Sequence, residues 1–392
     1  MESMIYFDQA ATTFPKPQAV TEEVLRCMRD YCGNPGRSSH RLSLAAAEKI
    51  FETRAALCAL FGADAPERVI FTCNATYALN LAIKSVLSRG DHVLISDFEH
   101  NSVYRPVCAL AAEGKIRFDV VDAYADAQTV VANFAAKLRP NTRLIAVTHV
   151  SNVCGVSLPI RELGTLCKKR GILFLVDASQ SAGALPIHME QDAIDALCGA
   201  GHKGLYGPQG TGYLVLSERF AARVLQTRTL IEGGNGYNST DRVMPAVFPE
   251  RLEAGTLATP AIAGLCEGIR FVSSLGVEAI GAHERTLAAR LKHRLAGMEN
   301  VILYAPDFTE GGTVLFNVRD VPSVNVASWL DEQGICVRAG FHCAPLAHKR
   351  LATGENGAVR VSFGAFNTAA EVDYAADCLE RYGDVRDPAE GI

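Results

Sequence analysis

The sequence predicts an α/β fold, and two observations support the prediction. Short runs rich in β-branched and other apolar residues recur along the first half of the chain, and segments with helical apolar spacing, such as 76–88 and 160–169, separate them. Apolar strands that alternate with helices are typical of a mostly parallel sheet covered on both faces. The expected strands are residues 68–72, 92–96, 143–150, 172–178, 194–199 and 211–216.

The pattern changes at about residue 259. A helix-rich stretch is followed by the apolar runs TVLFNV, ICVR and AVRVSF, interleaved with helices, which indicates a smaller α+β unit. A chain of 392 residues is long enough for two such units. We therefore expect a large domain over residues 15–258 and a small domain formed by residues 1–14 and 259–392.

Composition and charge exclude several classes of protein. Hydrophobic residues make up 48% of the chain, but no apolar run approaches the roughly 18 residues of a membrane-spanning helix. The N-terminal stretch MESMIYFDQAATTFPKPQ has neither the basic nor the apolar region of a secretory signal, so we expect a cytoplasmic protein without membrane contact. The net charge is −5 and the longest basic cluster is KKR at 168–170, so we expect no nucleic-acid partner.

The cysteines do not indicate a metal site. Twelve are scattered along the chain without a C-x-x-C pair, so most are expected to be reduced and buried as small apolar residues. The densest metal-like group is Cys336, His342, Cys343 and His348. Adjacent ligands at 342 and 343 fit poorly into one tetrahedral site, and we expect no metal.

Polar residues follow several of the expected strands at the points where the strands end. In an open α/β sheet, ligands bind beyond the carboxyl ends of the strands, so these residues should share one edge. The turn at Ala75 and Thr76 opens a helix whose N-terminus suits a phosphate. The other strand-end residues are His100, Asn152, Asp177, Gln180, His202 and Lys203.

Each of these residues also has a purely structural interpretation. A strand-end aspartate is commonly a turn former, and a single histidine can simply complete a turn. The glycines at 204–212 match neither the dinucleotide-binding pattern nor the P-loop pattern. Together, however, a lysine, a carboxylate and a phosphate site meet the needs of pyridoxal 5'-phosphate, which requires covalent attachment, a partner for its pyridine nitrogen and an anion site. The combination predicts this cofactor.

Motifs along nearly the whole chain match a known family. They are YFDQAATT (6–13), NATYALN (74–80), EHNS (99–102), HVSNVCG (149–155), VDASQSAG (176–183), GHKGLYGPQGTG (201–212), EAGT (253–256), RAGFHCAP (338–345) and RVSFGAFNT (360–368). With these motifs the chain resembles the class V aminotransferase-like, fold type I pyridoxal-phosphate enzymes, and within them the cysteine desulfurases and selenocysteine lyases. The resemblance implies a large domain with a mostly parallel seven-stranded sheet, a smaller α+β domain, and a homodimer.

The resemblance also implies roles for the residues around the cofactor. Lys203 would hold the cofactor, Asp177 would pair with the pyridine nitrogen and His100 would stack on the ring. The ring hydroxyl would be contacted by Gln180 and Asn152, and the phosphate by Ala75, Thr76 and His202. Thr256 resembles a residue that reaches the phosphate of the neighbouring subunit. Arg360 resembles the guanidinium that binds the substrate carboxylate, a task that suits its planar fork, and Arg338 is expected to be structural.

Cys343, in the stretch VRAGFHCAPLAHK, resembles the nucleophile of a desulfurase. The resemblance implies that Lys203 removes the Cα proton of cysteine and that the Cys343 thiolate takes the substrate sulfur as a persulfide, releasing alanine. Such a thiol needs an acid/base partner, and His342, His348 and His100 are candidates. The alternative is that Cys343 is only a small residue in a tight loop.

The chain departs from the family pattern at four positions. Ala200 stands where many relatives have Ser or Thr at the phosphate, Tyr77 where an acidic residue is common, and Phe341 where some relatives have a further histidine; Gly204 lengthens the turn after the lysine. Only sixteen residues separate Cys343 from Arg360, which resembles the branch with a short loop. Direct delivery of sulfur to a scaffold protein is therefore doubtful, although a sulfur-acceptor protein stays a candidate partner.

Three functions remain open from the sequence. The first is a cysteine desulfurase acting on cysteine. The second is a lyase that splits C–S or C–Se bonds of selenocysteine, cystine or a related amino acid without a protein persulfide. The third, which the complete set of cofactor residues disfavours, is a non-catalytic binding module on the same fold.

Overall fold

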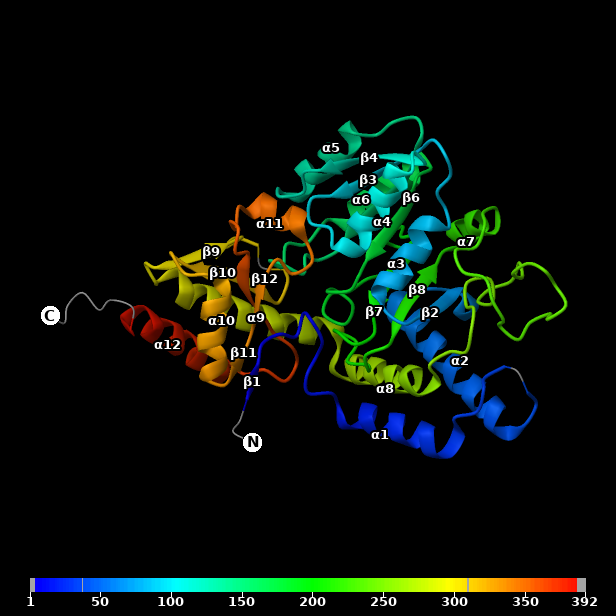
Figure 1. The fold of residues 1–392 in the computed structure, drawn as a ribbon, viewed down its shortest axis with the longest axis horizontal. Coiled ribbons are helices and arrows are strands. Elements are labelled where there is room, and N and C mark those ends of the chain that lie inside the picture. The colour runs from blue at the N-terminus through cyan, green and yellow to red at the C-terminus, as the bar shows by residue number, and fades with distance from the viewer. Residues whose placement is uncertain (1–3, 37, 309, 386–392) are drawn as a thin grey trace.

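A computed structural model describes residues 4–36, 38–308 and 310–385, and it has two lobes (Figure 1). The larger lobe contains a seven-stranded sheet in the order β2-β8-β7-β6-β5-β3-β4, in which β8 runs antiparallel to both neighbours and the other pairs are parallel. Its strands are β2 (Val69–Thr72), β3 (Asp91–Ser96), β4 (Ile116–Val121), β5 (Thr142–Thr148), β6 (Leu173–Asp177), β7 (Ala196–Ala200) and β8 (Gly212–Leu216). The expected α/β class and mostly parallel seven-stranded sheet are confirmed.

The sequence analysis missed one strand of this sheet. β4 lies at the edge, where it pairs only with β3, and its residues IRFDVV mix charged with apolar side chains. An edge strand is only partly buried, so it lacks the continuous apolar run that marked the central strands. The six expected strands are present with boundaries within about two residues, which is the usual uncertainty of such boundaries.

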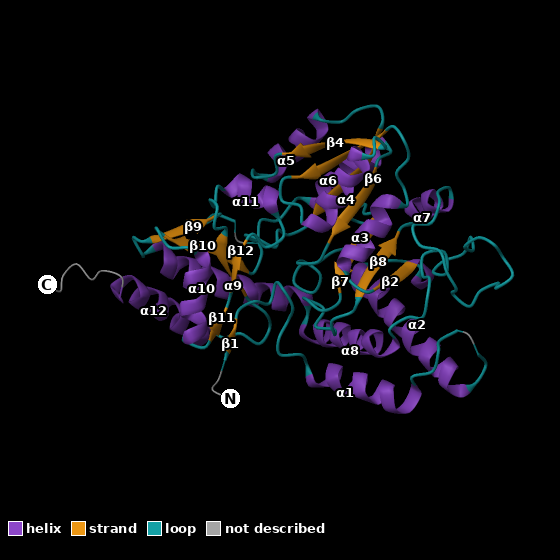
Figure 2. Ribbon diagram, in the orientation of Figure 1, coloured by secondary structure: helices purple, strands orange, loops and turns teal. Residues whose placement is uncertain are grey.

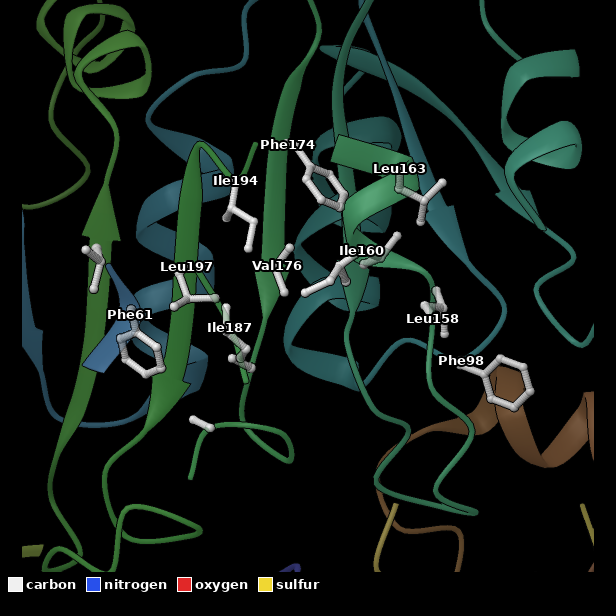
Figure 3. Close-up of a cluster of buried hydrophobic side chains, with 14 of the residues drawn as sticks. Phe61, Phe98, Leu158, Ile160, Leu163, Phe174, Val176, Ile187, Ile194 and Leu197 are labelled. Atoms are coloured by element: carbon white, nitrogen blue, oxygen red, sulfur yellow. The ribbon is translucent and has the colours of Figure 1, made fainter. Parts of the chain in front are cut away.

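Helices cover both faces of the large sheet (Figure 2). In β6, Phe174 and Val176 belong to one buried apolar cluster, and Leu173 and Leu175 to another, because successive side chains of a strand point to opposite faces. Figure 3 shows Phe174 and Val176 beside Ile160 and Leu163 of α6. The helices of this lobe are α1 (Gln18–Arg26), α2 (Arg41–Phe61), α3 (Ala75–Lys84), α4 (Asn101–Ala112), α5 (Ala127–Ala136), α6 (Ile160–Arg170), α7 (Glu218–Leu225) and α8 (Thr259–Leu275), with a π-helical turn at Cys27–Tyr31.

The smaller lobe contains an antiparallel sheet in the order β12-β13-β10-β9. Its elements are α9 (Val277–Ala296), β9 (Val301–Tyr304), β10 (Thr313–Val318), α10 (Ser323–Glu332), β12 (Arg338–Gly340), α11 (Pro345–Leu351), β13 (Ala358–Ser362) and α12 (Ala369–Val385). The run ICVR is not one strand: β11 (Ile335–Cys336) pairs with β1 (Ile5–Tyr6), whereas Arg338 begins β12. The domain boundaries stay a prediction.

No helix in the described ranges is both long and apolar enough to cross a bilayer.

Two glycines allow the turn after β6 to touch the turn that carries Lys203. Gly183 has a φ of +88°, and a Cβ on it would lie 2.0 Å from the carbonyl oxygen of Gly204. A Cβ on Gly204 would in turn lie 2.3 Å from the carbonyl oxygen of Ala182. Both distances are shorter than any real contact of a Cβ atom, so only glycine permits this approach. Gly204 therefore has a packing role that the sequence did not reveal.

We expect Gly183→Ala to lower the free energy of unfolding by more than about 2 kcal/mol, because the new methyl group adds a backbone clash to an unfavourable positive φ. Gly171→Ala is the matched control. Gly171 also has a positive φ, +69°, but a Cβ added to it would have no atom within 4 Å. Its substitution should cost only about 1 kcal/mol. Equal losses for the two variants in denaturant titrations would contradict the importance of this contact.

Candidate active site

A cavity of about 100 Å³ lies beyond the carboxyl ends of the central strands. Its walls come from the loops after β2, β3, β5, β6 and β7, as expected for an open α/β sheet. The lining residues include Ala75, Thr76, His100, Asn152, Asp177, Gln180, Ala200, His202 and Lys203. The structure thus brings together every predicted cofactor residue except Thr256.

Asp177 ends β6 and is almost completely buried. Its Oδ1 atom accepts hydrogen bonds from the backbone N–H of Ser179, at 2.9 Å, and from the Ser179 hydroxyl, at 2.5 Å. These bonds fix the carboxylate at the floor of the cavity. Ser179 was not among the predicted site residues, although it stands inside the motif VDASQ.

Lys203 lies in the turn between β7 and β8, and the N-terminal segment holds this turn from outside. The Thr13 hydroxyl donates to the Lys203 carbonyl at 3.1 Å, and Lys16 Nζ donates to the His202 carbonyl at 2.9 Å. Burial lowers the pKa of Lys203 to about 8, while Asp177 acts in the opposite direction. A sizeable fraction of the amine is therefore unprotonated near neutral pH.

His100 caps the N-terminus of α4, and its Nδ1 accepts a hydrogen bond from the Ser102 N–H at 3.1 Å. Burial and the nearby Lys203 ammonium lower the pKa of His100 to about 4. The ring is therefore neutral at physiological pH. A neutral imidazole held by a helix cap is suited to stacking on an aromatic ligand.

A helix begins at Ala75 and Thr76, where the sequence predicted a phosphate site. These residues begin α3, whose N-cap is Asn74, so free backbone N–H groups and the positive end of the helix dipole face the cavity wall. His202 lines the same cavity, and its buried Nδ1 has no hydrogen-bond partner among the described residues. Burial lowers the pKa of His202 to about 4. A neutral imidazole N–H can donate to a phosphate oxygen, so the residues present fit the phosphate of the cofactor.

Gln180 and Asn152 use their amide nitrogens for contacts inside the protein. Gln180 Nε2 donates to the Ala10 carbonyl at 3.0 Å, and Asn152 Nδ2 donates to the His342 carbonyl at 2.7 Å. Both side chains therefore link the large sheet to segments outside it while they line the cavity.

Arg360 is nearly completely buried, and its guanidinium is already engaged. One Nη donates to Asp8 Oδ1 at 2.6 Å and the other to the Asn152 carbonyl at 2.9 Å. Arg338, which was expected to be structural, is the register partner of Arg360 in the small sheet. Its exposed side chain has no hydrogen bond or ion pair with any described residue, yet it is close enough to lower the pKa of Lys203.

Cys343 is exposed and is not among the residues that line the cavity, but its backbone is joined to the loop that carries His100. Its carbonyl accepts a hydrogen bond of 2.7 Å from the N–H of Asn101, the residue after His100. Two of the three thiol partners considered from the sequence, His342 and His348, hydrogen bond to each other at 3.0 Å. In the described part of the chain, no group of three or more His, Cys, Asp or Glu side chains could hold a metal ion.

Thr256 lies outside the cavity that contains Lys203. It lines two other hollows, of about 320 and 260 Å³, the first of which also involves residues 34–36 and 235–237. Tyr77 lines the second of these hollows and is exposed. Within one subunit Thr256 therefore does not complete the Lys203 site, and its predicted contact with a partner's phosphate stays a prediction.

Comparisons with known proteins show the family of the chain. The family model described as aminotransferase class-V matches residues 5–375. The chain belongs to this family. Members of the class-V family use pyridoxal phosphate, so the predicted cofactor is that of the family.

Relatives within the class-V family share nearly the whole chain. A probable cysteine desulfurase of Pyrococcus abyssi is 34% identical over 97% of this chain and 94% of its own length. A cysteine desulfurase of Yersinia pestis is 32% identical over 97% and 93%. The apo structure of the cysteine desulfurase from Thermococcus onnurineus NA1 superposes with a TM-score of 0.89 at 31% identity, covering 97% of this chain and 95% of that one.

Removing a negative or a positive charge near Lys203 should shift its pKa in opposite directions. Asp177→Asn should lower the pKa below about 8, because the carboxylate raises it, and Arg338→Gln should raise it, because the guanidinium lowers it. The check is the pH dependence of Lys203 arylation by fluorodinitrobenzene in the cofactor-free protein, followed by peptide mapping. Exposed Lys137 serves as the internal reference. Shifts of the same sign in both variants would refute this electrostatic account.

Proposed function

We propose that the chain is a pyridoxal-phosphate-dependent cysteine desulfurase, which converts L-cysteine to L-alanine and receives the sulfur on Cys343 as a persulfide. The observation that carries the proposal is the arrangement around one cavity. Lys203, Asp177 and His100 line it together with the N-terminus of α3, and the backbone of Cys343 is bonded to its rim through Asn101.

The residues present can hold each part of the cofactor. Lys203 provides the amine, Asp177 the carboxylate for the pyridine nitrogen, and His100 the flat ring to stack on it. The phosphate would be held by the α3 N-terminus at Ala75 and Thr76, with His202. Ala200 offers no hydroxyl there, so the unpartnered Nδ1 of His202 takes on more of this task. When bound, the cofactor acts as an electron sink for the carbanion formed at the substrate Cα.

Lys203 is the base for the Cα proton. Its pKa of about 8 allows the free amine to exist near neutral pH without leaving it too weak a base. Asp177 is held in place by its hydrogen bonds to Ser179, so it needs no movement during the reaction. The lysine and the carboxylate therefore have different environments that suit different tasks.

After the Cα proton has been removed, Cys343 accepts the sulfur. Its thiolate attacks the substrate sulfur, so an S–S bond forms while the C–S bond breaks and its electron pair stays on the substrate carbon, which is then protonated to give alanine. His342 and His348 are bonded to each other, whereas His100 lines the cavity. We assign to His100 the proton transfers at sulfur.

The substrate carboxylate meets two arginines from neighbouring strands. Both Nη atoms of Arg360 have partners, and only its buried Nε is without one among the described residues, so a carboxylate that binds an Nη competes with Asp8 or the Asn152 carbonyl. Arg338 is exposed and unpaired in the described structure, so it is available without displacement. Both guanidinium groups favour an anionic substrate at this rim.

A lyase that acts on selenocysteine or cystine without a protein persulfide is the second candidate. The same cavity serves both reactions, but only the desulfurase reaction needs an exposed thiol near it. Cys343 meets that need, which favours the desulfurase. A non-catalytic module would not explain why a lysine with a lowered pKa lies in the same cavity as a buried carboxylate. A cytoplasmic location and a separate sulfur acceptor remain parts of the proposal.

Cys343→Ala should reduce alanine formation from cysteine by about a hundredfold or more, because the sulfur loses its acceptor. Mass spectrometry of the wild-type protein after one turnover should find one additional, reducible sulfur on Cys343. Borohydride should still fix the cofactor on Lys203 of the variant, which shows that the site is loaded. Full turnover of cysteine by Cys343→Ala, with no adduct in the wild type, would instead support the lyase.

The homodimer is tested by mixing two inactive chains. Lys203→Ala removes the amine, and Thr256→Asp places a negative charge where the partner's phosphate is expected. If sites are shared, a mixed dimer has one site with both changes and one with neither, so each heterodimer should regain about half of the activity of a wild-type dimer. No recovery after exchange of subunits, or full activity of a monomer, would exclude the shared site.

A further inference from the structure

Cys343 lies in a turn that its own residue types disfavour. The N–H of Ala344 donates to the Phe341 carbonyl at 3.1 Å, and the two central residues, His342 and Cys343, have φ values of +49° and +58°. Two central residues with positive φ are the mark of a type I′ turn, which normally contains Gly, Asn or Asp. A histidine and a cysteine adopt this conformation only if surrounding contacts stabilise it.

A series of buried and partly buried hydrogen bonds reaches this turn from α11 and the residues just after it. Thr353 Oγ1 lies 2.8 Å from His348 Nδ1, His348 Nε2 lies 3.0 Å from His342 Nδ1, and His342 Nε2 lies 3.3 Å from the Arg338 carbonyl oxygen. The two imidazole rings are stacked, with centroids 5.2 Å apart. In Figure 1, α11 lies between the strands of the small lobe and the large sheet.

The last acceptor in this series of hydrogen bonds determines which atom is the donor in each of them. A carbonyl oxygen can only accept, so His342 Nε2 carries the proton. Burial lowers the pKa of His342 to about 2 and that of His348 to about 4, so both rings are neutral. His342 Nδ1 must then accept from His348 Nε2–H, and His348 Nδ1 must accept from the Thr353 hydroxyl.

We propose that His348 and Thr353 are positioning residues that act through His342 to hold the turn bearing Cys343. Their hydrogen bonds fix the His342 ring from one side, and the Asn152 amide holds its carbonyl from the other. The Asn101 N–H fixes the next carbonyl, that of Cys343. The thiol is thereby kept at one place on the rim of the cavity. This role rests on the proposed function, because the thiol needs that place only to take sulfur from a substrate.

The test compares three substitutions on α11. His348→Met removes both ring nitrogens, and His348→Gln keeps an N–H donor close to the position of Nε2. Lys349→Met makes the same change at the adjacent exposed residue, whose side chain lies outside the hydrogen-bond chain. Hydrogen exchange reports the turn directly, through the amides of Asn101 and Ala344 that bond to the carbonyls of Cys343 and Phe341.

In His348→Met these two amides should exchange about tenfold faster, because a buried acceptor on His342 is left without its donor. Sulfur transfer to Cys343 in a single turnover should fall by about tenfold, while the apparent affinity for cysteine stays the same. His348→Gln should restore most of both losses, and Lys349→Met should resemble the wild type. Imidazole ¹⁵N spectra of the wild type should show the Nε2–H tautomer for both rings.

Several results would overturn the proposal. They are unchanged exchange in His348→Met, equal effects of Met and Gln, or an Nδ1–H or doubly protonated ring at position 342 or 348. Slower sulfur transfer with unchanged exchange would instead make His348 part of the chemistry. If His348→Met does not fold, Thr353→Val removes the hydroxyl and Thr353→Ser keeps it, so this pair again compares loss and retention of a hydrogen bond in the series. The exchange and ¹⁵N measurements need no turnover, so they decide the positioning role even if the wild type forms no persulfide.

Discussion

The backbone contact between the turn after β6 and the turn after β7 is the constraint on which the site depends. Asp177 ends β6 directly before the first turn, and Lys203 belongs to the second turn. Gly183 and Gly204 are the two residues that let the turns touch. Any side chain at either glycine would separate the carboxylate from the amine. The lowered pKa of Lys203 is a consequence, since the same close packing removes water from the amine while Asp177 limits the loss of charge.

The N-terminal segment and the small sheet complete the site from the other side. Thr13 and Lys16 bond to the backbone of the Lys203 turn, and Asp8 pairs with Arg360 of β13. Asn152 and Asn101 bond to the turn that carries Cys343. The thiol and the lysine therefore come from different lobes. These polar contacts, together with an apolar cluster that joins Val153 of the large lobe to Ala344 and Ala347 beside the thiol, set their relative position.

The sequence predicted the residues that follow the ends of strands. It did not predict pairings between residues that only the folded structure brings together. The fold class, six of the strands and the cavity set around Asp177 and Lys203 follow from apolar runs and the residues after them. β4 was missed because an edge strand need not be apolar throughout. The bonding of His342 with His348 was missed too, because histidines six residues apart face each other only after the Cys343 turn and α11 have formed. The free Arg338 could not be told from the paired Arg360 without the position of Asp8.

The Arg360–Asp8 pair has a consequence for how the site treats an anionic substrate. A guanidinium buried as deeply as that of Arg360 is costly without a countercharge, and Asp8 supplies that countercharge. A substrate carboxylate that bound the Nη shared with Asp8 would have to replace a bond of 2.6 Å and release Asp8 toward water, which offsets part of the energy gained. The exposed Arg338 requires no such exchange. Arg338 can therefore attract the carboxylate while Arg360 keeps the N-terminal segment in place. This arrangement breaks fewer existing bonds than binding by Arg360 alone, which the sequence suggested.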